Sequence, residues 1–202
     1  DQGAYSAKLD SLLKRPVWLP APKGIKNHSF RNHGDRTRAR FRLLRVLASE
    51  GFRAKNMIEV IKKREWAVSL LDKKMLYLPD GKGGYGQLKK AKKANIDELL
   101  DGLTSAKHAQ RVLDSDGPAP AQLSIPDDFI HWAEDRVLTI REMARIQSFP
   151  DWFEFRSKET TGGASRAFEV PQYTQVGNAV PPLLARSFGV AIKKALALSE
   201  TQ

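Results

Sequence analysis

Cysteine is absent from all 202 residues of the chain. The absence excludes disulfide bonds, thiolate ligands to a metal and a cysteine nucleophile within these residues. Histidine is scarce, with four residues, and neither His28 nor His33 lies near a carboxylate cluster at metal-ligand spacing. We therefore expect no metal site, and we expect these histidines to bind backbone groups at the start of a helix.

Long apolar runs are also absent. No run approaches the ~18 residues that a membrane-spanning helix needs, and no signal-peptide pattern opens the chain, so a cytoplasmic location is the default expectation. The first residue is Asp rather than Met, which predicts a chain that was processed or cut from a longer one. Hydrophobic residues make up 41% of the sequence, which excludes a fully disordered chain.

Basic residues outnumber acidic ones by 34 to 23, and the excess lies on one side of the sequence. Residues 1–113 hold 25 Lys and Arg against 11 Asp and Glu, whereas residues 114–202 hold 9 against 12. This asymmetry is typical of a polyanion-binding region joined to a packing region. Charge alone does not separate DNA binding from a ribosome-associated basic surface. A basic amphipathic membrane helix is disfavoured, because the basic residues are scattered over many segments.

The hydrophobic periodicity predicts a mixed α+β fold with a mostly helical front half. Gly51 and Pro182 mark the end of one helix and the first turn of another, and Thr139 and Glu142 form a Thr-x-x-Glu capping box. We expect helices over 37–49, 56–78 (as one helix or two), 96–103, 106–113, 139–147 and from 181 towards the C-terminus. Strands are expected over 121–125 and 173–176.

Two segments resemble motifs of the DNA (cytosine-5) methyltransferase family. Residues 136–151 read RVLTIREMARIQSFPD and resemble motif IX, and residues 173–182 read YTQVGNAVPP and resemble motif X. Their order and separation also agree with the family, and the Thr-Thr-Gly-Gly stretch at 160–163 is similar to bacterial members of the restriction–modification type. The segment NHSFRNH at 27–33 is more loosely similar to the segment after motif VIII in some of these enzymes. Residues 51–113 resemble nothing that we can name.

The resemblance implies roles for residues of both motifs. Motif IX is chiefly architectural in the family, which agrees with a capped helix stabilised by local charge pairs, and none of its residues is expected to be catalytic. The residues concerned are Arg136, Thr139, Arg141, Glu142 and Arg145. Motif X lies beside the S-adenosylmethionine pocket, which implies that Asn178 and Ala179, with Gly177 and Val180, border the cofactor's amino-acid portion. Many relatives carry serine where Ala179 stands. Spacing alone favours a simple strand–turn–helix connection for this segment.

The arginines near the predicted helix at 37–49 are candidates for DNA contacts. Arginine suits bidentate contacts to phosphate or guanine, and the series spreads around the helix, so some members are expected to be solvated. The candidates are Arg31, Arg36, Arg38, Arg40 and Arg42. We expect several of them to contact DNA phosphates, and the sequence does not indicate which one reads a base.

Motifs that the family needs for catalysis are missing from the 202 residues. The sequence has no Pro-Cys, no Phe-x-Gly-x-Gly, no Glu-Asn-Val and no Gln-x-Arg-x-Arg. The resemblance therefore implies a C-terminal part without catalytic residues of its own. It would comprise a basic target-recognition region (1–113), a linker and strand (114–135), and a motif IX and X segment (136–202) whose last helix completes a Rossmann-like methyltransferase domain.

Such a part would be inactive alone. It would bind double-stranded DNA, share the S-adenosylmethionine pocket and need a large subunit or N-terminal part that carries motifs I to VIII. The apolar face of the last helix, with Leu184, Phe188 and Ile192, would pack against that part. The sequence leaves open whether the chain is a natural small subunit or a piece of a longer chain. Two other hypotheses are a non-catalytic basic DNA-binding module and an RNA- or ribosome-associated protein.

Overall fold

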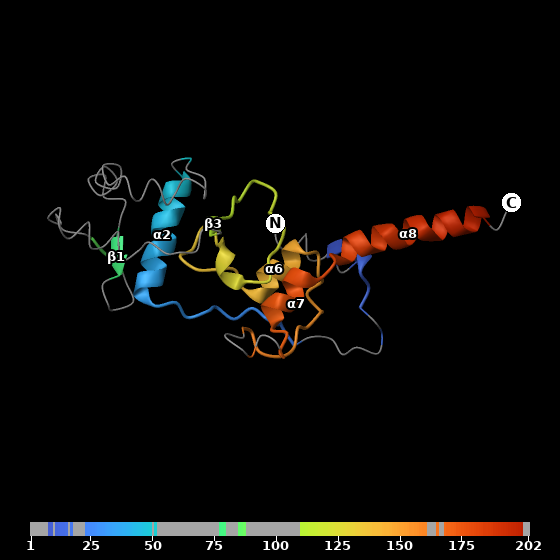
Figure 1. The fold of residues 1–202 in the computed structure, drawn as a ribbon, viewed down its shortest axis with the longest axis horizontal. Helices are drawn as coiled ribbons and strands as arrows, with labels where there is room; N and C mark the ends of the chain where they lie inside the picture. The colour runs from blue at the N-terminus through green and yellow to red at the C-terminus, as the bar shows by residue number, and fades with distance from the viewer. Residues whose placement is uncertain are drawn as a thin grey trace. The chain divides into compact units, whose positions relative to one another are not determined.

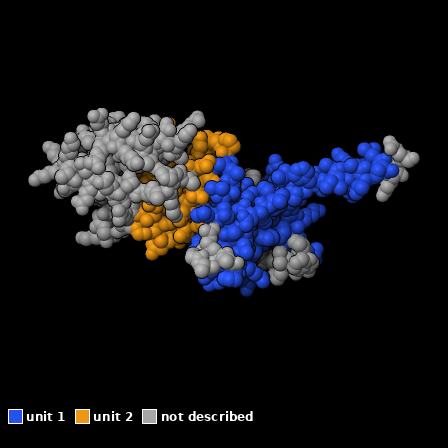
Figure 2. All heavy atoms as spheres, in the orientation of Figure 1, with its two compact units in different colours: residues 1–29, 119–125, 139–202 blue, residues 30–118, 126–138 orange. Residues whose placement is uncertain are grey.

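The computed structural model describes most of the chain as two compact units, drawn in two colours in Figure 2. The described residues are 8–9, 11–15, 17, 23–49, 51, 77–79, 85–87, 110–160, 165 and 168–199. Unit 1 comprises residues 1–29, 119–125 and 139–202, and unit 2 comprises residues 30–118 and 126–138. Helices and short two-stranded sheets confirm a mixed fold. In the part of the chain described, no helix is long and apolar enough to cross a membrane.

The described part of unit 2 contains helix α2, which spans Asp35–Ser49. Phe41, Leu43 and Leu47 are almost fully buried, and the arginines between them lie on the remaining surface of the helix. Gly51 has a φ of +86° and follows the helix, as the sequence predicted, because glycine accepts this left-handed conformation without strain. The predicted helix at 37–49 is therefore confirmed.

Two short strand pairs accompany α2 in unit 2 (Figure 1). Strand β1 (Tyr77–Pro79) pairs antiparallel with β2 (Tyr85–Gln87). Strand β3 (Arg111–Val112) pairs parallel with β4 (Phe129–Ile130), which comes after the 3-10 helix η1 (Pro126–Asp128). Phe129 and Ile130 are buried, and Ile130 also forms an antiparallel bridge with Val137. The second pair thus joins the core of the unit to the loop that precedes motif IX.

Unit 1 contains three helices of the motif IX and X region. Helix α6 spans Ile140–Ile146, α7 spans Gln172–Asn178 and α8 spans Pro182–Ser199. Helices α6 and α7 lie side by side (Figure 1), and their contact buries Met143, Tyr173 and Val176. Helix α8 has no buried residue along its 18-residue length.

Four secondary-structure predictions fail in whole or in part. The strand expected at 173–176 is wrong, because these residues belong to α7, where Tyr173 and Val176 lie one helical turn apart and both face the core. The strand expected at 121–125 does not form, because this segment runs beside α7 rather than beside another strand. The ends of two predicted helices are also wrong, since residues 77–78 lie in β1 and residues 111–112 in β3. The remainder of those helices, and the one expected at 96–103, lie outside the described residues.

Candidate functional site

The motif IX helix begins with the capping box that the sequence predicted. The Thr139 side chain accepts a hydrogen bond from the Glu142 N–H at 3.2 Å, and the Glu142 carboxylate accepts one from the Thr139 N–H at 2.8 Å. The Thr139 hydroxyl also lies 2.9 Å from Nδ1 of His28. Two otherwise unpaired N–H groups of the first turn are therefore satisfied, and the helix start is tied to a segment 111 residues earlier in the sequence.

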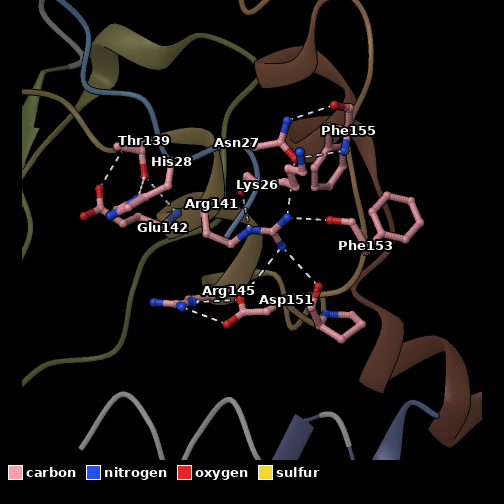
Figure 3. Close-up of polar contacts among 11 residues, drawn as sticks. Lys26, Asn27, His28, Thr139, Arg141, Glu142, Arg145, Asp151, Phe153 and Phe155 are labelled. Carbon is pink, nitrogen blue, oxygen red and sulfur yellow. Dashed lines mark hydrogen bonds and ion pairs between the residues drawn. The ribbon is translucent and has the colours of Figure 1, made fainter. Parts of the chain in front are cut away.

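Arg141 is the centre of a buried hydrogen-bond network in unit 1 (Figure 3). Its side chain has no exposed area, and its guanidinium donates to the backbone carbonyls of Lys26, Pro150 and Phe153. It lies 3.9 Å from the Asp151 carboxylate, so the buried charge also has an anionic neighbour. A buried guanidinium is tolerated where its N–H groups find acceptors, and here it joins the segment around Lys26 to the loop that follows α6.

Asn27 completes this network from the opposite side. Its φ of +62° is left-handed, a conformation that asparagine adopts more readily than most residues. Its amide donates to the Phe155 carbonyl and to the Gln172 side chain, both at 2.8 Å, and its carbonyl accepts from the Phe155 N–H at 3.0 Å. The Asn27 segment therefore connects motif IX to the first residue of α7 through Gln172.

Arg145 and Asp151 form the second charged contact of motif IX. Two guanidinium nitrogens of Arg145 lie 2.9 and 2.8 Å from the two carboxylate oxygens of Asp151, a bidentate geometry. Hydrogen bonding to Asp151 raises the pKa of Arg145 above its usual value. The pair closes the turn after α6, and the two side chains bind each other. The motif IX residues of unit 1 thus bind other parts of the chain.

The residues predicted to border the cofactor lie together at the junction of α7 and α8. Gly177 belongs to the last turn of α7, and a Cβ added there would lie 2.5 Å from the Leu123 carbonyl oxygen. The glycine is therefore required by close packing against residues 121–125. Asn178, the last residue of α7, is exposed, Ala179 caps the helix and is half-buried, and Val180 is 63% exposed. Their contact with a cofactor stays a prediction.

The predicted DNA-binding arginines lie in unit 2, and two of them have carboxylate neighbours. Arg31 lies 2.7 Å from Asp127, and Arg42 lies 3.5 Å from Asp135. Arg40 lies over the Phe41 ring at 5.6 Å from its centroid. Arg36 belongs to α2, and its side chain is not among the described parts of the structure. Whether these arginines contact DNA stays a prediction, and those paired with Asp127 or Asp135 already stabilise the unit itself.

A cavity of about 420 Å³ in unit 2 gathers arginines from three segments. We call it the arginine cavity. It is lined by residues 30–33, by Arg38, Arg42 and Arg45 from one face of α2, and by residues 133–136. Asp135, only 6% exposed, lies 2.7 Å from Arg45, which also donates to the Trp132 carbonyl. Residues that are separate in the sequence thus form one basic concave surface.

Arg136, the first residue of the motif IX resemblance, lines the same cavity in unit 2. Its guanidinium lies 2.7 Å from Glu134, donates to the Val137 carbonyl and lies 4.6 Å from the centroid of the Phe30 ring. Arg136 therefore contacts the loop 30–33 directly, which gives this residue a place in unit 2 rather than in the network around Arg141.

The model of a known protein family matches most of this sequence. The model of the C-5 cytosine-specific DNA methylase family matches residues 30–194, which is most of the chain and includes both the arginine cavity and the α7–α8 junction. The chain belongs to the C-5 cytosine-specific DNA methylase family. The family assignment made from motifs IX and X is thereby confirmed. No solved structure matches the chain.

Curated relatives of the chain include type II methyltransferases. The chain is 43% identical over 88 residues to "Type II methyltransferase M.AquIB" of a Picosynechococcus species, covering 43% of this chain and 63% of the relative. It is 48% identical over 69 residues to M.DdeI of Desulfomicrobium norvegicum, covering 34% of this chain and 16% of M.DdeI. DNA (cytosine-5)-methyltransferase 2 of Arabidopsis thaliana is 36% identical over 95 residues, covering 44% of this chain and 6% of that relative. The chain thus matches less than two thirds of each relative's length.

Sequence reasoning missed the two features that need long-range contacts. The contacts of Asn27 with Phe155 and Gln172 join residues 128 and 145 positions apart. The arginine cavity brings residues 30–33 to residues 133–136. The segment NHSFRNH, which contains Asn27 and His33, and the arginine series that includes Arg38 were the signals for these features, but neither indicated the distant partners.

Proposed function

We propose that this chain is the target-recognition and cofactor-pocket-completing part of a DNA (cytosine-5) methyltransferase. The single observation that carries the proposal is the combination of family membership with a 202-residue sequence that contains no cysteine. Methyl transfer to C5 of cytosine proceeds by attack of a cysteine thiolate on the flipped base. A second part must therefore supply the Pro-Cys motif, and methyl transfer from S-adenosylmethionine requires both parts.

The structure supports different roles for the two units. Unit 2 has the arginine cavity and the predicted DNA-binding arginines, which suit contact with the phosphates of duplex DNA. Unit 1 carries the motif IX network and the exposed α7–α8 junction, where Asn178 and Ala179 would border the amino-acid portion of S-adenosylmethionine. The exposed side chain of Asn178 supplies both a donor and an acceptor.

Helix α8 supports the need for a second part. Its apolar side chains remain in contact with solvent: Leu184 is 48% exposed, and Phe188 and Ile192 are each 60% exposed. A contiguous apolar face of this kind marks a protein interaction site. We assign it to the part that carries motifs I to VIII, which would cover α8 and complete a Rossmann-like methyltransferase domain.

The relatives leave open whether the chain is a natural subunit or a piece of a longer chain. Because 88 matched residues make up 63% of M.AquIB, that relative is about 140 residues long, so a curated type II methyltransferase chain can be short. For M.XorII from Xanthomonas oryzae, the 67 matched residues are only 13% of the relative, so that chain is longer. Both arrangements place the cysteine nucleophile outside the 202 residues.

The test is reconstitution of methyl transfer. The full chain is mixed with a separately purified partner that contains motifs I to VIII, and transfer of a labelled methyl group from S-adenosylmethionine to duplex DNA is measured. We expect no transfer by either part alone and transfer by the mixture. Transfer by the chain alone, or failure with every candidate partner while an intact relative is active, would contradict the proposal. DNA binding without any complementation would favour a non-catalytic DNA-binding module instead.

Asn178→Ala in the reconstituted enzyme tests the cofactor assignment separately. We expect weaker binding of S-adenosylmethionine, by about three- to tenfold for the loss of one or two hydrogen bonds, with DNA binding unchanged. Isothermal titration with the cofactor and a DNA-binding assay give the two affinities. A larger effect on DNA than on the cofactor would show that the motif X residues had been assigned the wrong role.

A further inference from the structure

The arginine cavity has a strong excess of positive charge over its whole lining. Five guanidinium groups line it against the carboxylates of Glu134 and Asp135, and Asp127, outside the lining, pairs with Arg31. Asp135 is shared by Arg42 and Arg45, so one buried carboxylate faces two cations. Arginine is suited to phosphate because its planar donors match the oxygens in a bidentate geometry. The cavity is therefore electrostatically prepared for an anion.

His33 supplies a buried polar atom in the same cavity. Its Nε2 is buried, and no described residue forms a hydrogen bond with it. The ring packs edge-on against Phe41, with ring centroids 5.1 Å apart. A buried nitrogen without a partner costs free energy, typically about 1–3 kcal/mol, and a bound ligand with oxygen atoms would satisfy it.

The size of the cavity indicates more than a bare oxyanion. A volume of about 420 Å³ lies in the range of about 300–1,000 Å³ that is typical of small-molecule pockets. The Phe30 ring lines it, is 61% exposed as a residue and lies beneath the Arg136 guanidinium. An apolar ring next to a group of cations suits a phosphate that carries its sugar, rather than free inorganic phosphate.

We propose that the arginine cavity binds one phosphodiester group of the DNA backbone, with Arg38 and His33 as donors and Phe30 beside the adjoining deoxyribose. The proposal rests on the proposed function only for the identity of the ligand as duplex DNA. It adds to that function a defined site, and it includes two residues, His33 and Phe30, that were not among the DNA-binding candidates.

Binding at this site also has a pH signature. Burial and the nearby Arg31 hold the pKa of His33 below its usual value, with smaller effects from Arg40 and Arg136 in the same direction and from Asp127 in the opposite one. A bound phosphate would raise the pKa of His33. DNA affinity would then rise as the pH falls through the pKa of the complex, and it would level off below the pKa of the free protein.

The experiment monitors His33 directly in the full chain. The histidine ring resonances are assigned by NMR with a His33→Gln variant, and the full chain is titrated with inorganic phosphate and with a short duplex DNA at several pH values. We expect both ligands to shift the His33 resonances and to raise its pKa, and we expect DNA to displace phosphate. His33→Gln should flatten the pH dependence of DNA affinity.

Arg38→Gln provides a second, independent measurement. It should weaken DNA binding about tenfold and reduce the slope of log affinity against log salt by about one. The matched control is Arg111→Gln, which removes an exposed arginine of the same unit that does not line the cavity. The control should leave the His33 response intact.

Two results would overturn the proposal. One is DNA binding that leaves the His33 resonances unshifted, together with an Arg38→Gln variant whose slope of log affinity against log salt equals that of the unchanged chain. The other is phosphate binding that duplex DNA does not displace, which would make the cavity a site for a free anion. Either result is compatible with successful reconstitution of methyl transfer, and failed reconstitution is compatible with DNA bound at this cavity. The two proposals can therefore fail separately.

Discussion

At the residue scale, Arg141 shows how a charged side chain can act as a core residue. Its guanidinium has no exposed area and donates to three backbone carbonyls, of which the contact with Pro150 is itself buried. A hydrophobic side chain of similar length would fill the same volume but would satisfy none of them. The residue is therefore specified by hydrogen bonding rather than by volume.

Arg141→Met tests this interpretation. Because the substitution removes a fully buried guanidinium that donates to three backbone carbonyls, we expect it to lower the free energy of unfolding by about 2–4 kcal/mol. The midpoint of urea unfolding of the full chain measures the effect. Arg156→Met, at an exposed position of the same unit, should change the midpoint little. Equal midpoints for the two variants would show that the network around Arg141 contributes no stability.

Gly177→Ala tests the second residue-scale constraint. The added methyl group would meet the backbone of residues 123–124 at 2.5–2.7 Å, and backbone atoms cannot move aside as a flexible side chain can. We expect a loss of about 1–3 kcal/mol in the free energy of unfolding. The control is Gly189→Ala in α8, where the methyl group would meet nothing within 4 Å and a helical glycine is replaced by alanine.

The control should have the opposite sign. Gly189→Ala is expected to stabilise α8 by up to about 1 kcal/mol, because alanine loses less backbone entropy than glycine in a helix. Circular dichroism during urea unfolding reports both variants. If Gly177→Ala proves neutral or stabilising as well, the close approach of residues 121–125 to α7 does not exist in solution.

At the element scale, the structure separates the features that local sequence predicts from those that tertiary contacts decide. Helices α2, α6 and α8 were predicted because each carries a signal at its end: a glycine after α2, a capping box before α6 and a proline in the first turn of α8. Helix α7 was mistaken for a strand because its seven residues have no side-chain cap and include residues common in strands. Its packing against α6 decides its conformation.

The same distinction applies to the candidate site. Residues 177–180 could be found from the sequence because they are contiguous and belong to a recognisable motif. Asn27 could not be connected with Arg141, because their contact spans 114 positions and depends on the left-handed backbone at Asn27. The arginine cavity could not be found either, since residues 133–136 lie about 90 positions or more from the rest of its lining.

Thr139→Ala tests the contribution of the capping box. It removes the cap of α6 and the hydrogen-bond partner of His28, so we expect a loss of about 0.5–2 kcal/mol in the free energy of unfolding. Thr139→Ser keeps the hydroxyl and should recover most of that loss. Thermal unfolding of the three chains gives the comparison. If serine does no better than alanine, the hydroxyl is not the stabilising group.

At the scale of the whole molecule, we expect the exposed apolar face of α8 to govern how the chain behaves alone. Phe188→Glu combined with Ile192→Glu replaces two residues of its exposed apolar face by charges. We expect the isolated chain to aggregate less, since an exposed apolar patch promotes association, and to retain DNA binding by unit 2. Methyl transfer after reconstitution should fall at least tenfold, because two charges would be buried against the partner.

Ser187→Glu is the matched control for this last prediction. It introduces a charge beside Phe188 at a position that is exposed and polar, so reconstituted activity should stay within about twofold of the unchanged chain. Gel filtration measures association, and the methyl-transfer assay measures complementation. Full activity of the doubly substituted chain would mean that α8 is not the surface that binds the part with motifs I to VIII, even if reconstitution itself succeeds.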